Sequence, residues 1–274
     1  MKFKRNERIG AIVKILSDNP NTVFTLSYFT EKFNAAKSTI SEDVLVVKNV
    51  FEKMNLGQVI TIAGAAGGVK YIPKISKKDN IIFLESICKQ LNDKSRLLPG
   101  GFLYIIDLIY NPQIAHKIGK IFASYIDYKD ADYVVTMETK GIPMALMTAS
   151  AMNLPLVIIR KDSKVSEGSA ISITYMSEST KRVQMMSLPR KALKENSKVI
   201  LIDDFMRGGG TLKAMEDLMK EFNAKVIGKG VFIAMAEPKE KQVDDYVSLI
   251  DFQIVEDKMQ ITPNKDFVIQ NSEN

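Results

Sequence analysis

The sequence has few of the residues on which disulfide-bonded, metal-binding and membrane proteins depend. Cys88 is the only cysteine among 274 residues, which excludes an intrachain disulfide and a zinc site made of cysteines. No apolar run approaches the ~18 residues that a membrane-spanning helix needs. Residues 1–7 include basic side chains, but no apolar segment follows them, so they do not resemble a secretory signal. We therefore expect a cytoplasmic protein without a membrane partner.

Histidine is equally scarce. His116 is the only one, in a segment with a helical pattern. A metal site or a catalytic triad needs further partners, so neither is expected around it, and we predict no metal ligand and no catalytic residue in the chain. The composition, 46% hydrophobic and 26% charged, is typical of globular proteins and excludes a disordered, collagen-like or purely coiled-coil chain.

Charge is distributed unevenly along the chain. Residues 1–74 contain 11 Lys and Arg against 6 Asp and Glu, whereas residues 75–274 contain 27 against 26. Most of the net charge of +6 therefore belongs to the first quarter. This asymmetry is typical of a polyanion-binding module joined to a nearly neutral domain, although a solvated basic surface would give the same count. We predict two domains, 1–74 and 75–274.

The first domain has the pattern of three helices followed by a hairpin. Pro20 ends the first predicted helix, whose inner face carries Ile9, Ile12, Val13 and Leu16. Thr25 can cap a short second helix. A third is predicted from about Ser38, with Thr39 and Glu42 as a capping box. Its inner face carries Ile40, Val44, Val47, Phe51 and Met54. The β-rich runs 59–62 and 69–72 then flank the glycine-rich segment 63–68.

This order predicts a winged helix-turn-helix that binds double-stranded DNA. A lysine and small hydroxyls at the start of the third helix suit phosphate contact, because the free N–H groups and the helix dipole also attract anions. A small tip would let the hairpin approach a groove. The predicted DNA-binding residues are Lys37, Ser38, Thr39, Ser41, Gly67, Gly68 and Lys70. The alternatives are a helical cap that binds nothing and a protein-docking module.

The second domain alternates strands and helices. A helix is predicted over 80–98, with Cys88 on its apolar face as a core residue, and a strand over Phe102–Ile106. Further strands are predicted over 132–137, 156–159, 199–202 and 226–234, with helices over 144–152 and 211–222. Such alternation predicts a doubly wound, mostly parallel α/β sheet with its sites at the carboxyl ends of the strands.

The most informative segment is Val199–Thr211, in which an apolar strand leads to two adjacent acids and a glycine-rich turn. Two carboxylates can accept hydrogen bonds from the vicinal hydroxyls of a ribose. The glycines let N–H groups converge on a phosphate at a helix N-terminus. The segment is neither a Walker A loop nor a G-x-G-x-x-G motif. A purely structural cap is the alternative.

This segment resembles the signature of type I phosphoribosyltransferases, which bind phosphoribosyl pyrophosphate (PRPP). The resemblance assigns Asp203 and Asp204 to the ribose. It assigns the following loop to the 5′-phosphate: Phe205, Met206, Arg207, Gly208, Gly209, Gly210 and Thr211. Many members have threonine where this chain has Gly208, so backbone donors must replace one side-chain contact.

Three further segments fit the same family. Thr139, Lys140 and Gly141 follow a predicted strand and resemble the pyrophosphate loop. Lys161 belongs to a basic pair like that of adenine- and xanthine-type members. The polar stretch Asp162–Arg190, which contains Tyr175, corresponds to the mobile loop of the family, although a solvated β-hairpin would have the same composition.

The combination of both domains resembles the purine repressors of Gram-positive bacteria over almost the whole chain. The segments that match best are Ala65–Pro73 and Asp203–Met206. The resemblance implies a homodimer that binds operators of purine-synthesis genes and releases them when PRPP binds, with or without Mg²⁺. No cofactor is required. The alarmone ppGpp could place its diphosphates in the same anion sites.

Two other functions remain open at this point. An active purine phosphoribosyltransferase with an accessory DNA-binding domain would have to place a base and exclude water. The sequence presents no clear base pocket and no acid–base pair, which favours a sensor without transferase activity. A transcription factor that activates, with PRPP as a structural ligand, is the third possibility.

Overall fold

The computed structural model describes residues 3–64, 67–162, 168–177, 182–256 and 258–264. Contacts within the chain divide it into two compact units. The first is Met1–Ser76 with Ser150–Asn153, and the second is Lys77–Ala149 with Leu154–Asn274. Among the described residues, no helix is long and apolar enough to cross a bilayer.

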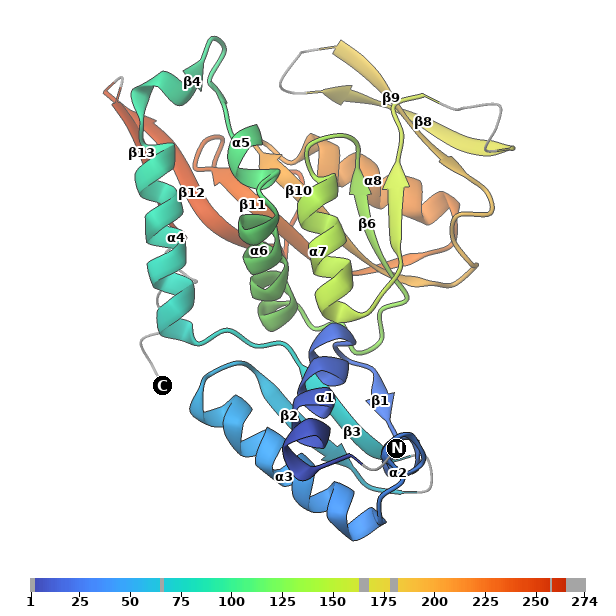
Figure 1. Ribbon diagram of the computed structural model, residues 1–274. Coiled ribbons are helices and arrows are strands. Elements are labelled where there is room, and N and C mark those ends of the chain that lie inside the picture. The colour runs from blue at the N-terminus through green and yellow to red at the C-terminus, as the bar shows by residue number, and fades with distance from the viewer. Residues whose placement is uncertain (1–2, 65–66, 163–167, 178–181, 257, 265–274) are drawn as a thin grey trace. The chain divides into compact units, whose positions relative to one another are not determined.

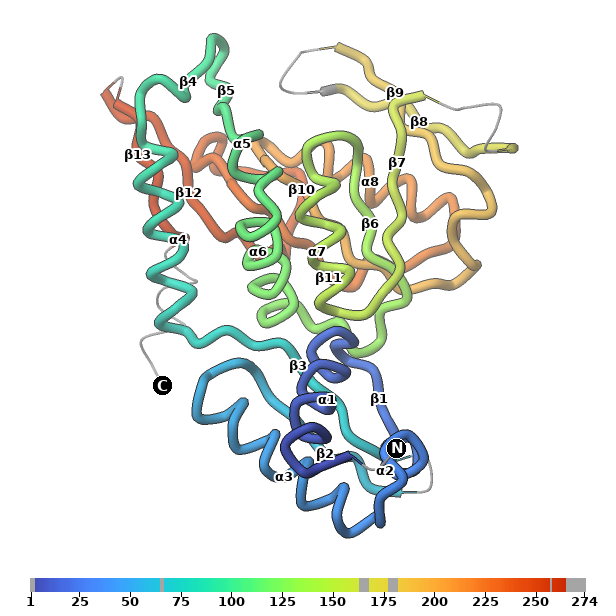
Figure 2. Tube along the Cα trace, in the orientation of Figure 1, coloured from blue at the N-terminus to red at the C-terminus, as the bar shows by residue number. Residues whose placement is uncertain are grey.

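Three helices in the predicted order open the first unit: α1 (Arg5–Asp18), α2 (Leu26–Phe33) and α3 (Lys37–Lys53) (Figures 1 and 2). Thr25 caps α2 as predicted, because its hydroxyl accepts a hydrogen bond of 3.1 Å from the amide of Tyr28. The apolar faces of the three helices meet in one core, in which Ile12, Phe29 and Val47 are fully buried.

The start of α3 differs from the prediction. Its N-cap is Ala36, and no side chain accepts a hydrogen bond there. The capping box of Thr39 and Glu42 is therefore wrong, since α3 begins two residues before Thr39 and the first turn is already formed. Met54 follows the end of the helix and is 65% exposed, so it does not belong to the inner face.

An antiparallel sheet completes the first unit. The predicted hairpin is β2 (Gln58–Ile62) and β3 (Gly68–Ile72), and a short strand that we did not predict, β1 (Val23–Phe24), pairs with the other edge of β3. This arrangement is a winged helix. Residues 65 and 66 of the predicted tip lie outside the described residues.

The second unit is built on a mostly parallel sheet, as predicted, and this sheet has six strands. Its order is β13-β12-β11-β10-β6-β7, in which β13 is antiparallel and the other strands are parallel. The strands are β6 (Tyr133–Met137), β7 (Leu156–Ile159), β10 (Lys198–Met206), β11 (Lys225–Met235), β12 (Val247–Val255) and β13 (Lys258–Pro263). We did not predict β12 and β13.

Helices cover both faces of this sheet. They are α4 (Lys77–Leu91), α5 (Ile106–Ile109), α6 (Pro112–Tyr125), α7 (Ile142–Met152) and α8 (Gly210–Glu221). Phe122 of α6 packs over Gly230 of β11, whereas the next residue, Val231, packs in a core cluster with Leu212 of α8. Successive strand residues face opposite sides, so α6 and α8 lie on opposite faces (Figure 1).

The segment before α5 differs from the prediction. The helix predicted over 80–98 ends at Leu91, because the amide group of Asn92 bonds to both the backbone N–H and the backbone C=O of Ile261 in β13. In place of the strand predicted over 102–106, the chain forms a small hairpin of two strands with two residues each, β4 (Leu97–Leu98) and β5 (Phe102–Leu103). Cys88 is buried, and burial raises the pKa of its thiol to about 12. It is a core residue, as predicted.

Candidate functional site

The carboxyl ends of the parallel strands form the site edge of the second unit. β6 pairs with β7 on one side and with β10 on the other, so the strand order reverses at β6. Crossover connections leave in opposite directions from such a reversal, and a crevice opens between the strand ends. The segments singled out by sequence follow these strands: Thr139–Gly141 after β6, Lys161 after β7, and Arg207–Thr211 after β10.

The two acids lie within β10, which extends past them to Met206. Asp203 still pairs in register with Val231 of β11, whereas β6 pairs with β10 only as far as Ile202. One edge of the strand is therefore free of ladder bonds at the acids. The amide of Asp204 donates a hydrogen bond of 3.0 Å to Oδ1 of Asp203.

Burial and charge set the protonation of this pair. Burial raises the pKa of Asp203 well above its usual value, and the adjacent charge of Asp204 raises it further. Burial also raises the pKa of Asp204, which the ammonium of Lys140 partly offsets. A ligand that presents hydroxyl donors to both carboxylates would favour their ionised forms. The pair therefore suits a polyhydroxyl ligand. Without such a ligand, its burial costs free energy of folding.

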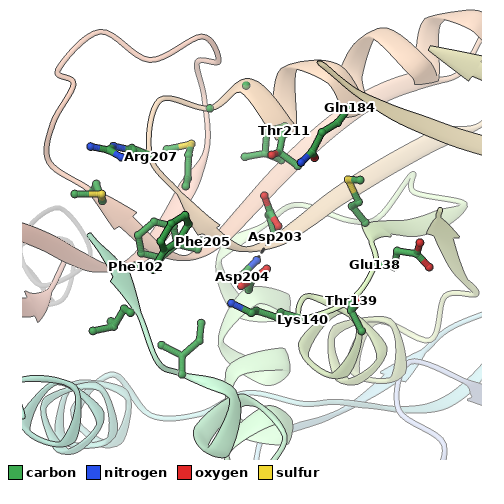
Figure 3. A pocket seen from close by; sticks show the side chains of 18 of the residues that line it. Phe102, Glu138, Thr139, Lys140, Gln184, Asp203, Asp204, Phe205, Arg207 and Thr211 are labelled. Carbon is green, nitrogen blue, oxygen red and sulfur yellow. Dashed lines mark hydrogen bonds between the residues drawn. The ribbon is translucent and has the colours of Figure 1, made fainter. Parts of the chain in front are cut away.

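The glycine-rich turn connects β10 to α8. Gly209 is the N-cap of α8 and has a φ of 94°, which a residue with a side chain rarely adopts. No side chain caps the helix there, so its first N–H groups are available to an anion. Thr211 lies in the first turn of α8, and the side chain of Arg207 is exposed beside the glycine-rich turn (Figure 3).

The loop after β6 is tied to the end of β7 by a carboxylate that we did not predict. Oε1 of Glu138 accepts a hydrogen bond of 2.8 Å from the amide of Lys161, and Oε2 lies 3.2 Å from the guanidinium of Arg160. Burial alone would raise the pKa of Glu138, but these two contacts lower it below its usual range. Glu138 therefore fixes the loop of Thr139 and Lys140 against the next strand.

The polar stretch 162–190 contains a β-hairpin, β8 (Ala170–Ser177) and β9 (Arg182–Pro189), whereas residues 163–167 and 178–181 lie outside the described residues. Tyr175 donates a hydrogen bond of 2.9 Å to Oε1 of Gln184 across the hairpin. Burial raises the pKa of Tyr175, and a hydrogen bond with Thr211 partly offsets the rise. The hairpin thus meets the start of α8.

These segments enclose a cavity of about 370 Å³. All the residues that the resemblance assigned to PRPP line it except Gly141 and Gly208. Gly141 is buried, and a side chain there would meet Oγ1 of Thr136 at 2.6 Å, which explains a glycine without ligand contact. Sequence reasoning missed Phe102, Glu138 and Gln184 (Figure 3). Glu138 directly precedes the predicted pyrophosphate loop, which is the sequence signal that could have identified it.

The cavity has an anionic and polar region and an apolar one. In Figure 3, Asp203, Asp204, Lys140 and Thr211 lie in one part of the pocket, and the rings of Phe102 and Phe205 lie in another. Such a pocket can hold a phosphorylated sugar beside a planar apolar group. Among the described residues, no group of three His, Cys, Asp or Glu side chains is placed to hold a metal ion.

The winged helix presents the predicted DNA-binding residues in two groups. Lys37, Ser38 and Ser41 are exposed in the first turns of α3, whose N–H groups have no side-chain cap. Lys70 is half-buried in the central strand β3. Gly68 is buried, since a side chain there would collide with the carbonyl oxygen of Phe24 in β1. Packing therefore accounts for this glycine without any contact to DNA.

The fold and the pocket define a class: a winged helix joined to a domain of the phosphoribosyltransferase type. The chain matches the family described as "Bacterial purine repressor, N-terminal" over residues 4–73 and the phosphoribosyl transferase domain over residues 106–262. In structure it is similar to adenine phosphoribosyltransferase from Thermoanaerobacter pseudethanolicus, with a TM-score of 0.53, 19% identity and 61% of this chain and 99% of that chain covered. That likeness shows the fold alone.

The relatives narrow the class to one family. The chain is 42% identical over 271 residues to the purine biosynthesis transcriptional repressor PurR of Bacillus subtilis, covering 99% of this chain and 93% of that protein. It is 38% identical to the purine biosynthesis transcriptional activator PurR of Lactococcus lactis, covering 90% and 92%. The chain belongs to the PurR family of transcriptional regulators of purine biosynthesis.

Proposed function

We propose that this protein is a DNA-binding repressor of purine biosynthesis genes and that PRPP bound in the cavity releases it from operator DNA. The observation that carries the proposal is the position of Asp203 and Asp204 beside the phosphate-binding loop of α8 in one cavity. Vicinal hydroxyls, a 5′-phosphate and a diphosphate are the groups that this arrangement suits, and PRPP carries all three.

The DNA-binding part of the proposal is supported by charge and helix geometry. Residues 1–74 have 11 basic against 6 acidic side chains. The uncapped start of α3 offers N–H donors and the hydroxyls of Ser38 and Ser41 to phosphates. Most of the affinity would come from phosphate contacts, so operator binding would weaken steeply with salt. A homodimer would present two such helices to the two half-sites of an operator.

PRPP can release DNA only if it binds the free protein more tightly than the DNA complex. The experiment is fluorescence anisotropy of a purine-gene upstream fragment at fixed salt, titrated with protein, with and without PRPP and Mg²⁺. Loss of operator binding with PRPP is the expected result. Operator binding that PRPP leaves unchanged would contradict the release mechanism.

A second candidate function is activation. The relative of Lactococcus lactis is named an activator, although it is 38% identical over most of this chain. In that case PRPP would strengthen operator binding or leave it unchanged, and a transcription assay with purified polymerase would show more transcript with protein than without it. The same anisotropy titration therefore separates the two modes.

Transferase activity is not part of the proposal. Among the described residues that line the cavity are two phenylalanine rings, and none of these residues is placed as an acid or base for a purine. The ionisable side chains among them are Glu138, which pairs with Arg160, and those assigned to PRPP. A turnover assay with PRPP and purine bases should give no nucleotide.

The rings of Phe102 and Phe205 instead provide an apolar surface for the base of ppGpp. Calorimetry that detects no heat of binding at millimolar ppGpp would exclude ppGpp as a second ligand.

A further inference from the structure

A short segment after β11 contacts the glycine-rich turn. Nζ of Lys241 donates to the carbonyl oxygen of Arg207 at 2.6 Å and to that of Met235 at 2.7 Å. The amide of Gln242 donates to the carbonyl oxygen of Gly208 at 2.8 Å. None of residues 241–243 lines the cavity.

The third contact joins Val243 of this segment to Gly209 of the turn. Val243 is buried in the core with Met206 and Leu212, and a side chain at Gly209 would lie 3.1 Å from its Cγ2. Residues 241, 242 and 243 therefore contact residues 207, 208 and 209 in register. The turn is held by one charged donor, one backbone donor and one apolar contact.

These contacts determine where the N–H groups of the turn point. Both peptide bonds concerned are trans, so each C=O and the following N–H project to opposite sides. Lys241, by binding the carbonyl of Arg207, directs the N–H of Gly208 away from itself. Gln242 does the same for the N–H of Gly209. A cation on the carbonyl also polarises the peptide, which makes its N–H a stronger donor.

We infer that Lys241 is a positioning residue for the phosphate-binding turn, which it holds with its N–H groups directed to the 5′-phosphate of the ligand. The inference rests on the proposed function, which assigns the turn from Arg207 to Thr211 to the phosphate; Gly208 itself does not line the cavity. A turn whose backbone is held by Lys241 and Gln242 would also compensate for the glycine at position 208, where many phosphoribosyltransferases have threonine.

The test compares Lys241→Met, which keeps the length of the side chain but removes its charge, with Lys241→Arg and with Lys239→Met. Lys239 is exposed in the same segment, so its variant loses the same charge without the two carbonyl contacts. Isothermal calorimetry would measure the Kd of the full-length protein for PRPP, for ribose 5-phosphate and for inorganic pyrophosphate.

In Lys241→Met, the Kd for PRPP and for ribose 5-phosphate should rise about tenfold, which corresponds to about 1.4 kcal/mol. The Kd for pyrophosphate should stay the same, because pyrophosphate would bind at Thr139–Gly141. Lys241→Arg should recover most of the loss, and Lys239→Met should match the parent protein. Equal losses for all three ligands, or equal losses in both methionine variants, would overturn the inference.

A measurement without ligand separates this inference from the proposed function. Amide hydrogen exchange at residues 208–210 should be about tenfold faster in Lys241→Met than in Lys239→Met. If the parent protein does not bind PRPP, the proposed function fails, whereas faster exchange still supports the positioning of the turn. Unchanged exchange in Lys241→Met would refute the positioning role whether or not PRPP binds.

Discussion

The guanidinium of Arg8 lies 2.6 Å from Oδ2 of Asp43, with both side chains almost completely buried between α1 and α3. Arg8 also donates to the carbonyl oxygen of Phe3 at 3.0 Å, and the exposed Arg5 lies 3.5 Å from the other carboxylate oxygen. The pair thus fixes α3 to α1. Breaking one partner of a buried pair leaves a charge without compensation.

We therefore expect Asp43→Asn or Arg8→Met to destabilise the winged helix by about 3 kcal/mol. Chemical denaturation of the full-length protein measures this loss. Lys14→Met is the matched control, since it breaks the exposed pair with Asp18 and should cost less than about 0.5 kcal/mol. Equal effects at both positions would show that burial does not govern the Arg8 pair.

Asp203 and Asp204 should be dispensable for DNA binding and required for its release. Asn at both positions would remove the charged acceptors for the ribose hydroxyls and raise the Kd for PRPP about 100-fold, from two charged hydrogen bonds of about 1.5 kcal/mol each. Operator affinity without PRPP should be unchanged. Anisotropy titration would show a repressor that PRPP no longer releases. Loss of operator binding in the double variant would contradict this division of roles.

The same pair should make the ligand-free protein less stable as the pH rises. The pKa of Asp203 is raised in the folded state, so its stabilising contribution is present below the unfolded pKa of ~3.9 and is lost as the pH rises through the folded value. Asp203→Asn should therefore unfold at a higher temperature than the parent protein, with a larger difference at pH 8 than at pH 5.

Asp217 provides the control of opposite sign for that experiment. Burial by itself would raise its pKa, but the hydrogen bond from Lys220 and the charges of Lys213 and Lys220 together lower it overall. Its contribution is therefore present above ~3.9 and is lost at lower pH. Asp217→Asn should not be more stable than the parent protein at pH 8. If the Tm difference between Asp203→Asn and the parent protein were the same at pH 5 and pH 8, the prediction that Asp203 destabilises the ligand-free protein at higher pH would be refuted.

Lys37 and Lys70 should contribute to DNA binding through phosphates. Changing either to Ala should weaken binding to operator and unrelated DNA alike and reduce the slope of log K against log salt by about 1. Lys53→Ala is the matched control, because it removes the same charge at the opposite end of α3. Binding by anisotropy at several salt concentrations measures the slope. An equal change in Lys53→Ala would indicate a general charge effect.

The local pattern of the sequence was sufficient to predict most elements and the chemistry of the main motif. Helical spacing identified α1, and Thr25 capped α2 as predicted, because apolar periodicity and capping act over a few residues. The acids and the glycine-rich turn are likewise contiguous in sequence. Phosphosugar binding could therefore be predicted from Asp203–Thr211 alone.

Contacts between distant residues were decided only by the tertiary structure. Strand β1 forms because β3 offers it an edge, and α4 ends where Asn92 reaches β13, 169 residues further along the chain. Glu138 beside Lys161 and Lys241 behind Arg207 leave no local pattern either. Sequence by itself determined which groups we propose as ligand-binding, because their chemistry is local. Folding decided which residues hold those groups in place, because that depends on strand order and on the packing of segments far apart in the chain.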